Sequence, residues 1–277
     1  MKLKYFSVLA GIFLFFCFTG VSAKIHSEPR QKTLPGSVKW LVQIHGNTTL
    51  LYQLADESIV PGIVDYVEKS RNIIESFFGK SFPETFVVHI FPNRVSLSAF
   101  WRKAWKLPDF EAACWMVGSG SSTGLTLLSP RVWRKEACEH DPDDRQHIQR
   151  LIAHEMVHIF HAQVNPLHNL DDLEPIGWFV EGLAVYVSGQ LEGAYLADPR
   201  EAVLSGKAPT KLENAWSGKY RYGVSGTLVK FIDKTYGRDV IKKLLVQTTE
   251  PGILKFLGTT EKKFLRNWRE FVLNDSK

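Results

Sequence analysis

The spacing of apolar and polar residues predicts strands in the first half of the chain. Residues 38–45 and 50–54 flank the turn-forming pair Gly46-Asn47, which predicts two strands joined by a turn. Stretches rich in β-branched, aromatic or small apolar residues predict three further strands, at 85–91, 112–117 and 124–128. Small residues at 118–122 predict a loop between the last two strands. Helical spacing predicts helices at 61–78 and 93–106.

The second half of the chain has the spacing of helices. A long helix is predicted at 145–164, where Asp143 and Asp144 precede the end of the helix that favours negative charge. Helical periodicity continues in four segments, at 175–190, 220–236, 238–247 and 260–273. Strands followed by helices predict an α+β fold with two lobes and a cleft where the lobes meet.

The N-terminus has the pattern of a secretory signal peptide. Lys2 and Lys4 precede an apolar run at 6–18, and Val21-Ser22-Ala23 has the small residues of a cleavage site. The run is shorter than the ~20 residues that span a bilayer. We therefore predict a signal peptide at 1–23, a single catalytic domain at 24–277, and export to the periplasm, the envelope or the medium. An uncleaved N-terminal anchor is the other interpretation, and the only membrane contact that we expect.

Charge and cysteine content narrow the partners and the compartment. Without Lys2 and Lys4 of the predicted signal peptide, the formal net charge falls from +5 to +3. This charge is too small to indicate a nucleic-acid partner, and the basic residues are scattered singly. Export places Cys114 and Cys138 where a disulfide can form. Two buried thiols would give the same sequence pattern.

The motif His154-Glu155-Met156-Val157-His158 lies within the predicted helix at 145–164. Residues four apart lie one turn up the same helix face, so both imidazoles can approach one zinc ion at about 2.0 to 2.1 Å. Glu155 lies about 100° around the axis from His154. In that position a carboxylate can act as the general base on the attacking water.

A catalytic zinc usually has three protein ligands, and Glu181 is the candidate for the third. Residues 176–187 are apolar on nearly every side, which predicts a buried helix with Glu181 as its one carboxylate. Burying an unpaired carboxylate costs several kcal/mol, so the usual outcomes are neutralisation, an ion pair such as one with an arginine, or a metal. Of these, a metal also completes the site of His154 and His158. The neighbouring Gly182 would let this helix approach the histidine helix closely. We predict one Zn²⁺ per chain, held by His154, His158 and Glu181.

These residues resemble those of a known family. His154-Glu-x-x-His158 followed by Trp178-x-x-Glu181-Gly182-x-Ala184 is similar to the gluzincin metallopeptidases, and most similar to the small peptidase-MA-like domains of exported bacterial proteins. The resemblance implies a thermolysin-like two-lobed zincin fold, with a mixed sheet and active-site helix in the N-terminal lobe and a helical C-terminal lobe. It implies the same ligands and Glu155 as the base.

The chain departs from this family at two places. Val185 stands where thermolysin-like members have an aspartate that supports a ligand, so that supporting residue is unassigned. The Gly-x-Met-Glu-Asn segment of zinc aminopeptidases is missing upstream, which favours an endopeptidase.

The resemblance also suggests residues around the substrate. Tyr222 resembles the tyrosine that begins a helix and stabilises the tetrahedral intermediate, with Tyr220 and His168 as alternatives. Residues 124–130 resemble the edge strand that binds an extended peptide. Ordinary packing is the other interpretation of both features.

Several other residues need weighing as ligands or cleft residues. His161 lies seven residues after His154 without the glycine that precedes the third histidine of metzincins, which favours a supporting or partly exposed role. Cys138, His140, Asp141 and His147 fit a solvated acidic loop better than a second metal site. Four tryptophans either line a cleft or belong to the core: Trp101, Trp105, Trp115 and Trp133.

Together these patterns predict an exported zinc metallopeptidase, an endopeptidase that hydrolyses peptide or protein substrates. The alternative is a noncatalytic envelope scaffold that binds protein partners, whose expected signature is loss of a ligand or of the base. His154, Glu155, His158 and Glu181 are all present, which favours the enzyme. A zinc hydrolase acting on a non-peptide amide also fits these residues.

Overall fold

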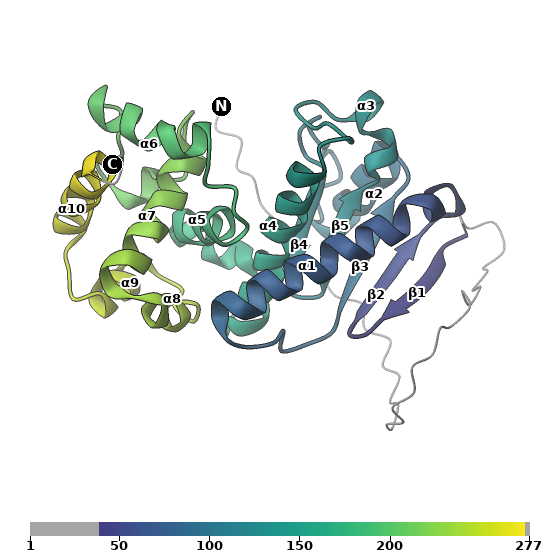
Figure 1. Ribbon diagram of the computed structural model, residues 1–277, viewed down its shortest axis with the longest axis horizontal. Coiled ribbons are helices and arrows are strands. Elements are labelled where there is room, and N and C mark those ends of the chain that lie inside the picture. Colours follow the sequence, from purple (N-terminus) through teal and green to yellow (C-terminus); the bar gives the residue numbers. More distant parts are fainter. Residues whose placement is uncertain (1–38, 275–277) are drawn as a thin grey trace. The chain divides into compact units, whose positions relative to one another are not determined.

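The computed structural model describes residues 39–274, so the predicted signal peptide lies outside the described residues. Contacts divide the described chain into two compact units. The first contains residues 39–65, 84–119 and 123–144, and the second contains 66–83, 120–122 and 145–274. The chain combines a five-stranded sheet with a helical C-terminal part (Figure 1), which confirms the predicted α+β class.

The sheet is mixed, as predicted. Its strand order is β1 (Leu41–His45), β2 (Thr48–Tyr52), β3 (Phe86–Phe91), β5 (Gly124–Leu128) and β4 (Gly118–Ser121). The pair β1 and β2 is antiparallel across the turn at Gly46, whose φ of 53° favours glycine. The pairs β2 with β3 and β3 with β5 are parallel.

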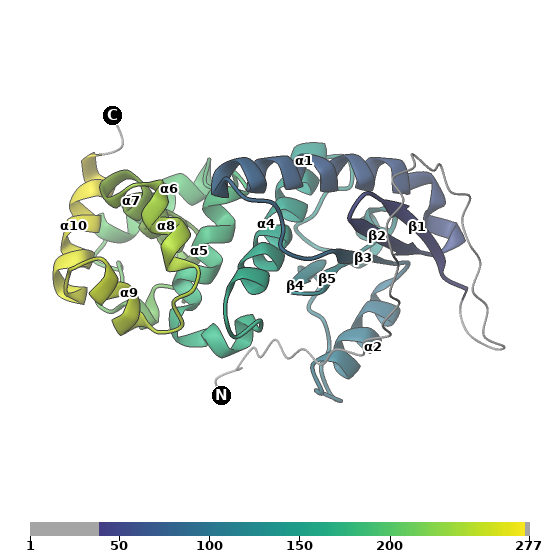
Figure 2. The ribbon, with the colours of Figure 1, turned by 90° about the horizontal axis from the view of Figure 1, so that it is seen from below.

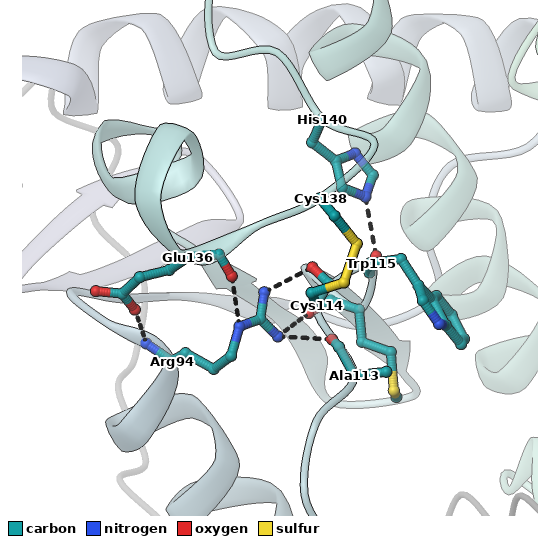
Figure 3. Close-up of a disulfide and its surroundings, with 8 residues drawn as sticks. Arg94, Ala113, Cys114, Trp115, Glu136, Cys138 and His140 are labelled. Atoms are coloured by element: carbon teal, nitrogen blue, oxygen red, sulfur yellow. Dashed lines mark hydrogen bonds between the residues drawn. A yellow bond between two sulfur atoms is a disulfide. The ribbon is translucent and has the colours of Figure 1, made fainter.

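One predicted strand and one predicted loop are wrong. Residues 112–117 form no strand. The Arg94 guanidinium donates hydrogen bonds to the backbone carbonyl groups of Ala113, Cys114 and Met116 at 2.8 to 2.9 Å (Figure 3), so these groups are not available to a neighbouring strand. The predicted loop at 118–122 contains β4 instead. A sequence of Gly and Ser has low strand propensity, and β4 forms because it pairs with the neighbouring strand β5.

A disulfide closes the segment before β4. Cys114 and Cys138 are joined, with their Cα atoms 5.2 Å apart, which decides between the two interpretations of these cysteines (Figure 3). The Glu136 carboxylate accepts a hydrogen bond from the Arg94 backbone N–H at 2.5 Å, and the Glu136 carbonyl accepts one from the Arg94 side chain at 2.6 Å. The disulfide and Arg94 therefore hold the same two segments together.

Removing this disulfide should destabilise the protein. The bridge spans 24 residues of sequence, and a loop of that size restricts the unfolded chain by about 3 kcal/mol. We expect the double variant Cys114→Ala, Cys138→Ala to lose about this much free energy of unfolding, measured by urea denaturation. The reduced wild-type protein should match the variant, and an unchanged urea midpoint in both would contradict the prediction.

The helices largely follow the predicted segments. They are α1 (Val60–Phe78), α2 (Arg94–Ala104), α3 (Trp133–Glu136), α4 (Arg145–Val164), α5 (Gly177–Val187), α6 (Ala194–Leu204), α7 (Arg221–Tyr236), α8 (Arg238–Leu244), α9 (Glu250–Phe256) and α10 (Glu261–Asn274). Helices α3, α6 and α9 lie outside the predicted helical segments. Pro175 lies in the 3-10 turn Leu170–Ile176, which runs directly into α5. None of the described helices combines the length and apolar composition that a membrane span requires.

The apolar helix α5 is packed inside the second unit. Figure 2 shows it between α4 and α7. A Cβ on Gly182 would lie 2.2 Å from the backbone oxygen of Ser225 in α7, and one on Gly226 would lie 2.8 Å from the Val185 side chain. The prediction that Gly182 faces the histidine helix is therefore wrong, because this glycine permits close approach to α7. Near-total burial of α5 is confirmed.

The tryptophans of the first unit mostly belong to its core. Trp101, Trp105 and Trp133 are buried, and the first two rings stack with centroids 4.9 Å apart. Trp115 is 38% exposed. Core packing is thus the correct interpretation of three of the four.

Candidate metal centre

Helix α4 presents two histidines from the same face. His154 and His158 stand one turn apart, with their Nε2 atoms 3.2 Å from each other. Both side chains are nearly buried, and 13 residues of α4 are buried, including both histidines. The helix periodicity and the burial thus place two imidazole edges at one point inside the second unit.

Helix α5 brings a carboxylate to the same point. The Glu181 Oε2 atom lies 3.4 Å from His154 Nε2 and 3.7 Å from His158 Nε2. Among the residues that the structure describes, these three form the one group of possible metal-ligating side chains, with donor atoms within 4.8 Å of one another. The three residues proposed as ligands are brought together, and the ionic partners of Glu181 are these histidines rather than an arginine.

Within this group, Glu181 and His158 shift each other's pKa values. Burial raises the pKa of Glu181, but the charge on His158 and hydrogen bonds from both histidines outweigh it and hold that pKa well below its ordinary value. Burial lowers the pKa of His158, yet the Glu181 charge outweighs it and the pKa rises. The carboxylate therefore stays charged and favours a positive charge between the rings.

The donor set fits zinc. Two imidazole nitrogens and one carboxylate oxygen are the ligands of a common type of catalytic zinc site. Neutral rings that direct their lone pairs at each other across 3.2 Å repel unless a proton or a cation lies between them. Buried His158 Nδ1 has no hydrogen-bond partner among the described residues, so the polar contacts of this ring are made at Nε2, which faces His154 and Glu181.

Glu155 is held by the strand β4. Its Oε2 atom accepts a hydrogen bond of 2.8 Å from the Gly120 backbone N–H. A Cβ on Gly120 would lie 2.0 Å from the Glu155 backbone oxygen, so a glycine is needed for this approach. Gly120 was not among the predicted site residues, because the small residues at 118–122 predict a loop.

The strand order corrects the expected peptide-binding edge. Strand β5 lies between β3 and β4, so residues 124–128 are an interior strand rather than the edge. The end of the sheet near Glu155 is β4. Sequence pattern favoured β5 because its β-branched and apolar residues look like a strand, whereas the Gly-Ser-Gly-Ser of β4 does not.

A glutamine supports His154 where an aspartate was missing. The Gln190 Oε1 atom lies 2.7 Å from His154 Nδ1. Val185, at the position of the missing aspartate, packs against Gly226 of α7 instead. The sequence placed Gln190 at the end of the helix predicted at 175–190, but α5 ends at Val187 and Gln190 lies in the connection after it, so its contact with His154 was not predicted.

Tyr222 lies in the first turn of α7 among aromatic rings. Its ring stacks on Tyr195 with centroids 5.1 Å apart, and Trp216 meets it edge-on at 4.8 Å. Burial raises the pKa of Tyr222, and the charge of Glu181 raises it further. The rival Tyr220 donates its hydroxyl hydrogen to Glu201 at 2.6 Å. The other rival, His168, lies outside the metal-ligating group.

Two other histidines that were weighed as metal ligands make contacts with backbone carbonyl groups. His161 is fully buried, with Nε2 3.2 Å from the Leu245 carbonyl oxygen, and burial with the nearby His158 charge lowers its pKa to about 3. Of the two roles that the sequence left open for His161, supporting or partly exposed, its full burial excludes the second. His140 Nε2 lies 2.9 Å from the Trp115 carbonyl oxygen. A second group of metal-ligating side chains is absent from residues 39–274.

Comparisons with known proteins give distant structural likenesses. No protein-family model matches the chain, and no curated protein matches it. Solved structures that resemble it include an M1 zinc metallopeptidase mutant from Deinococcus radiodurans, with 14% identity and a TM-score of 0.45. Another is a two-domain M1 zinc metallopeptidase mutant bound to L-tryptophan, with 14% identity and a TM-score of 0.44. Each covers 87% of this chain, which spans about half (51%) of either matched chain.

Proposed function

We propose that this chain is an exported zinc metallopeptidase that cleaves internal peptide bonds, built as a two-lobed gluzincin of the peptidase-MA-like type. The observation that carries the proposal is the convergence of His154, His158 and Glu181, with Glu155 beside them on α4. When bound, zinc supplies Lewis acidity, which polarises a carbonyl group and makes a water molecule more acidic.

The side chains divide the remaining work. His154, His158 and Glu181 bind the ion, and their combined charge leaves it net positive. Glu155 takes a proton from the attacking water and passes it to the leaving amine nitrogen. The Gly120 N–H supports this role, because it holds one carboxylate oxygen of Glu155 in place. The Tyr222 hydroxyl donates a hydrogen bond to the substrate oxygen as negative charge develops there.

The edge strand β4 is the proposed site for the substrate backbone. An extended peptide can add to a sheet edge through main-chain hydrogen bonds, and β4 is the edge that touches Glu155. Its sequence, Gly-Ser-Gly-Ser, leaves little side-chain bulk between a peptide and the strand. Backbone recognition of this kind suits cleavage within a peptide rather than capture of a terminal amine.

The rival proposal is a noncatalytic envelope scaffold that binds protein partners. A scaffold has no need of Glu155 or of the glycine that orients it. The presence of both beside three converging ligands supports the enzyme.

The test is zinc-dependent cleavage by the mature protein, residues 24–277. We expect the purified protein to cleave members of a broad peptide library, read by mass spectrometry, with new termini at internal bonds. A chelator should abolish cleavage, and stoichiometric zinc should restore it. Zinc-loaded protein that cleaves no peptide would refute the peptidase, and cleavage unaffected by the chelator would refute the role of the metal.

A further inference from the structure

The connection between α5 and α6, residues 188–193, is turned back toward the metal centre. Gly189 has a φ of 77°, a conformation that favours glycine, and it follows the last residues of α5. The Gln190 N–H then donates to the Val185 carbonyl oxygen at 3.1 Å. The backbone at Gln190 is thus fixed by the end of the helix that carries Glu181.

Side chains of this connection reach two neighbouring helices. Gln190 contacts His154 of α4, and Glu192 forms an ion pair with Arg150, which lies one turn before His154 on the same helix. Leu191 lies against α7, where its Cδ1 atom is 3.1 Å from the position of a Cβ on Gly226. The connection is therefore attached on both sides of Gln190, which limits how far the amide can move.

The amide oxygen selects one form of the His154 ring. A neutral imidazole carries its hydrogen on one nitrogen and a lone pair on the other. Because Gln190 Oε1 can only accept, the hydrogen lies on Nδ1, and the lone pair of Nε2 faces His158 and Glu181. We propose that Gln190 is a positioning residue, which holds His154 in the orientation and tautomer that binds the metal. This inference rests on the proposed function.

A neutral amide in this role has a chemical consequence. A carboxylate would accept a stronger, charge-assisted hydrogen bond from His154 Nδ1 and donate more electron density to the ring. With an amide as the acceptor, His154 donates less electron density to the metal than it would beside a carboxylate, so a bound ion would keep more of its positive charge. Gln190→Glu should therefore keep or strengthen zinc binding, because it preserves the acceptor at nearly the same reach.

The test is zinc affinity, measured by competition with a chromophoric chelator. Gln190→Leu removes the acceptor at similar volume, and we expect zinc affinity to fall about 10-fold to 100-fold. Gln190→Glu should remain within about threefold of wild type or bind more tightly. If the leucine variant does not fold, Gln190→Asn replaces it, because its shorter side chain withdraws the carbonyl from His154. Unfolding of the zinc-free proteins shows which variants fold.

Gln149 supplies a matched control on α4. Its amide donates to the Tyr66 carbonyl oxygen at 3.0 Å and to the Ser70 hydroxyl at 2.7 Å, and neither bond involves a histidine. Gln149→Leu should lower the stability of the zinc-free protein and leave its zinc affinity unchanged. The inference is overturned if Gln190→Leu keeps wild-type zinc affinity or if Gln149→Leu loses as much zinc affinity as Gln190→Leu. It is also overturned if Gln190→Glu binds zinc as weakly as Gln190→Leu. Failure of the peptidase proposal reads differently: zinc binds and depends on Gln190, but no peptide is cleaved.

Discussion

Glu155→Gln should lower kcat for peptide cleavage by roughly 10³-fold, a typical contribution of a general base, while the protein still binds zinc. The amide keeps the shape of the side chain but cannot take the proton of the attacking water. Glu181→Ala should instead weaken zinc binding, because it removes a ligand. We expect zinc affinity to fall by more than about 100-fold, which is the largest typical loss when only a residue supporting a ligand is removed. Metal content per chain and single-substrate kinetics measure the two effects separately.

The pair of variants distinguishes the base from the ligand. Both residues are carboxylates within one site, yet Glu155 hydrogen-bonds to Gly120 and Glu181 contacts the two histidines. Zinc-free unfolding curves control for loss of the fold in either variant. Full zinc affinity in Glu181→Ala would place the third ligand elsewhere and end the gluzincin proposal. Undiminished cleavage by Glu155→Gln would remove Glu155 from the mechanism.

The sequence alone was sufficient to identify the candidate metal ligands, because polar side chains at these positions are costly to bury without a partner. His154 and His158 have the spacing of one helical turn, and Glu181 is a carboxylate in an otherwise apolar helix. Both signals are local: periodicity sets the helix face, and the cost of burying charge demands a partner. The three donor groups lie together in the structure, and no prediction of long-range contacts was needed to name them.

What the sequence could not indicate depends on neighbours distant along the chain. The residues of β4 have low strand propensity, and this strand forms because β5 offers it a partner. Gly182 was correctly read as a site of close approach, but which helix it meets is a property of packing, and that helix is α7. Gln190 was predicted to lie in the helix at 175–190, but α5 ends at Val187, so helical periodicity could not give the direction of this side chain.

Gly120→Ala should reduce peptide cleavage by at least about 100-fold while zinc remains bound, because a displacement of about 1 Å in a catalytic group can cost that much. The added methyl group would lie 2.0 Å from the Glu155 backbone oxygen and 3.2 Å from His158 Cβ. Helix α4 is largely buried, so β4 should yield at Gly120, and the 2.8 Å hydrogen bond to the Glu155 carboxylate should break. The ligands lie on α4 and α5 and should stay in place. Gly62→Ala is the matched control, since its methyl group meets no atom within 4 Å. Normal cleavage by Gly120→Ala would show that β4 neither orients the base nor forms the substrate-binding edge.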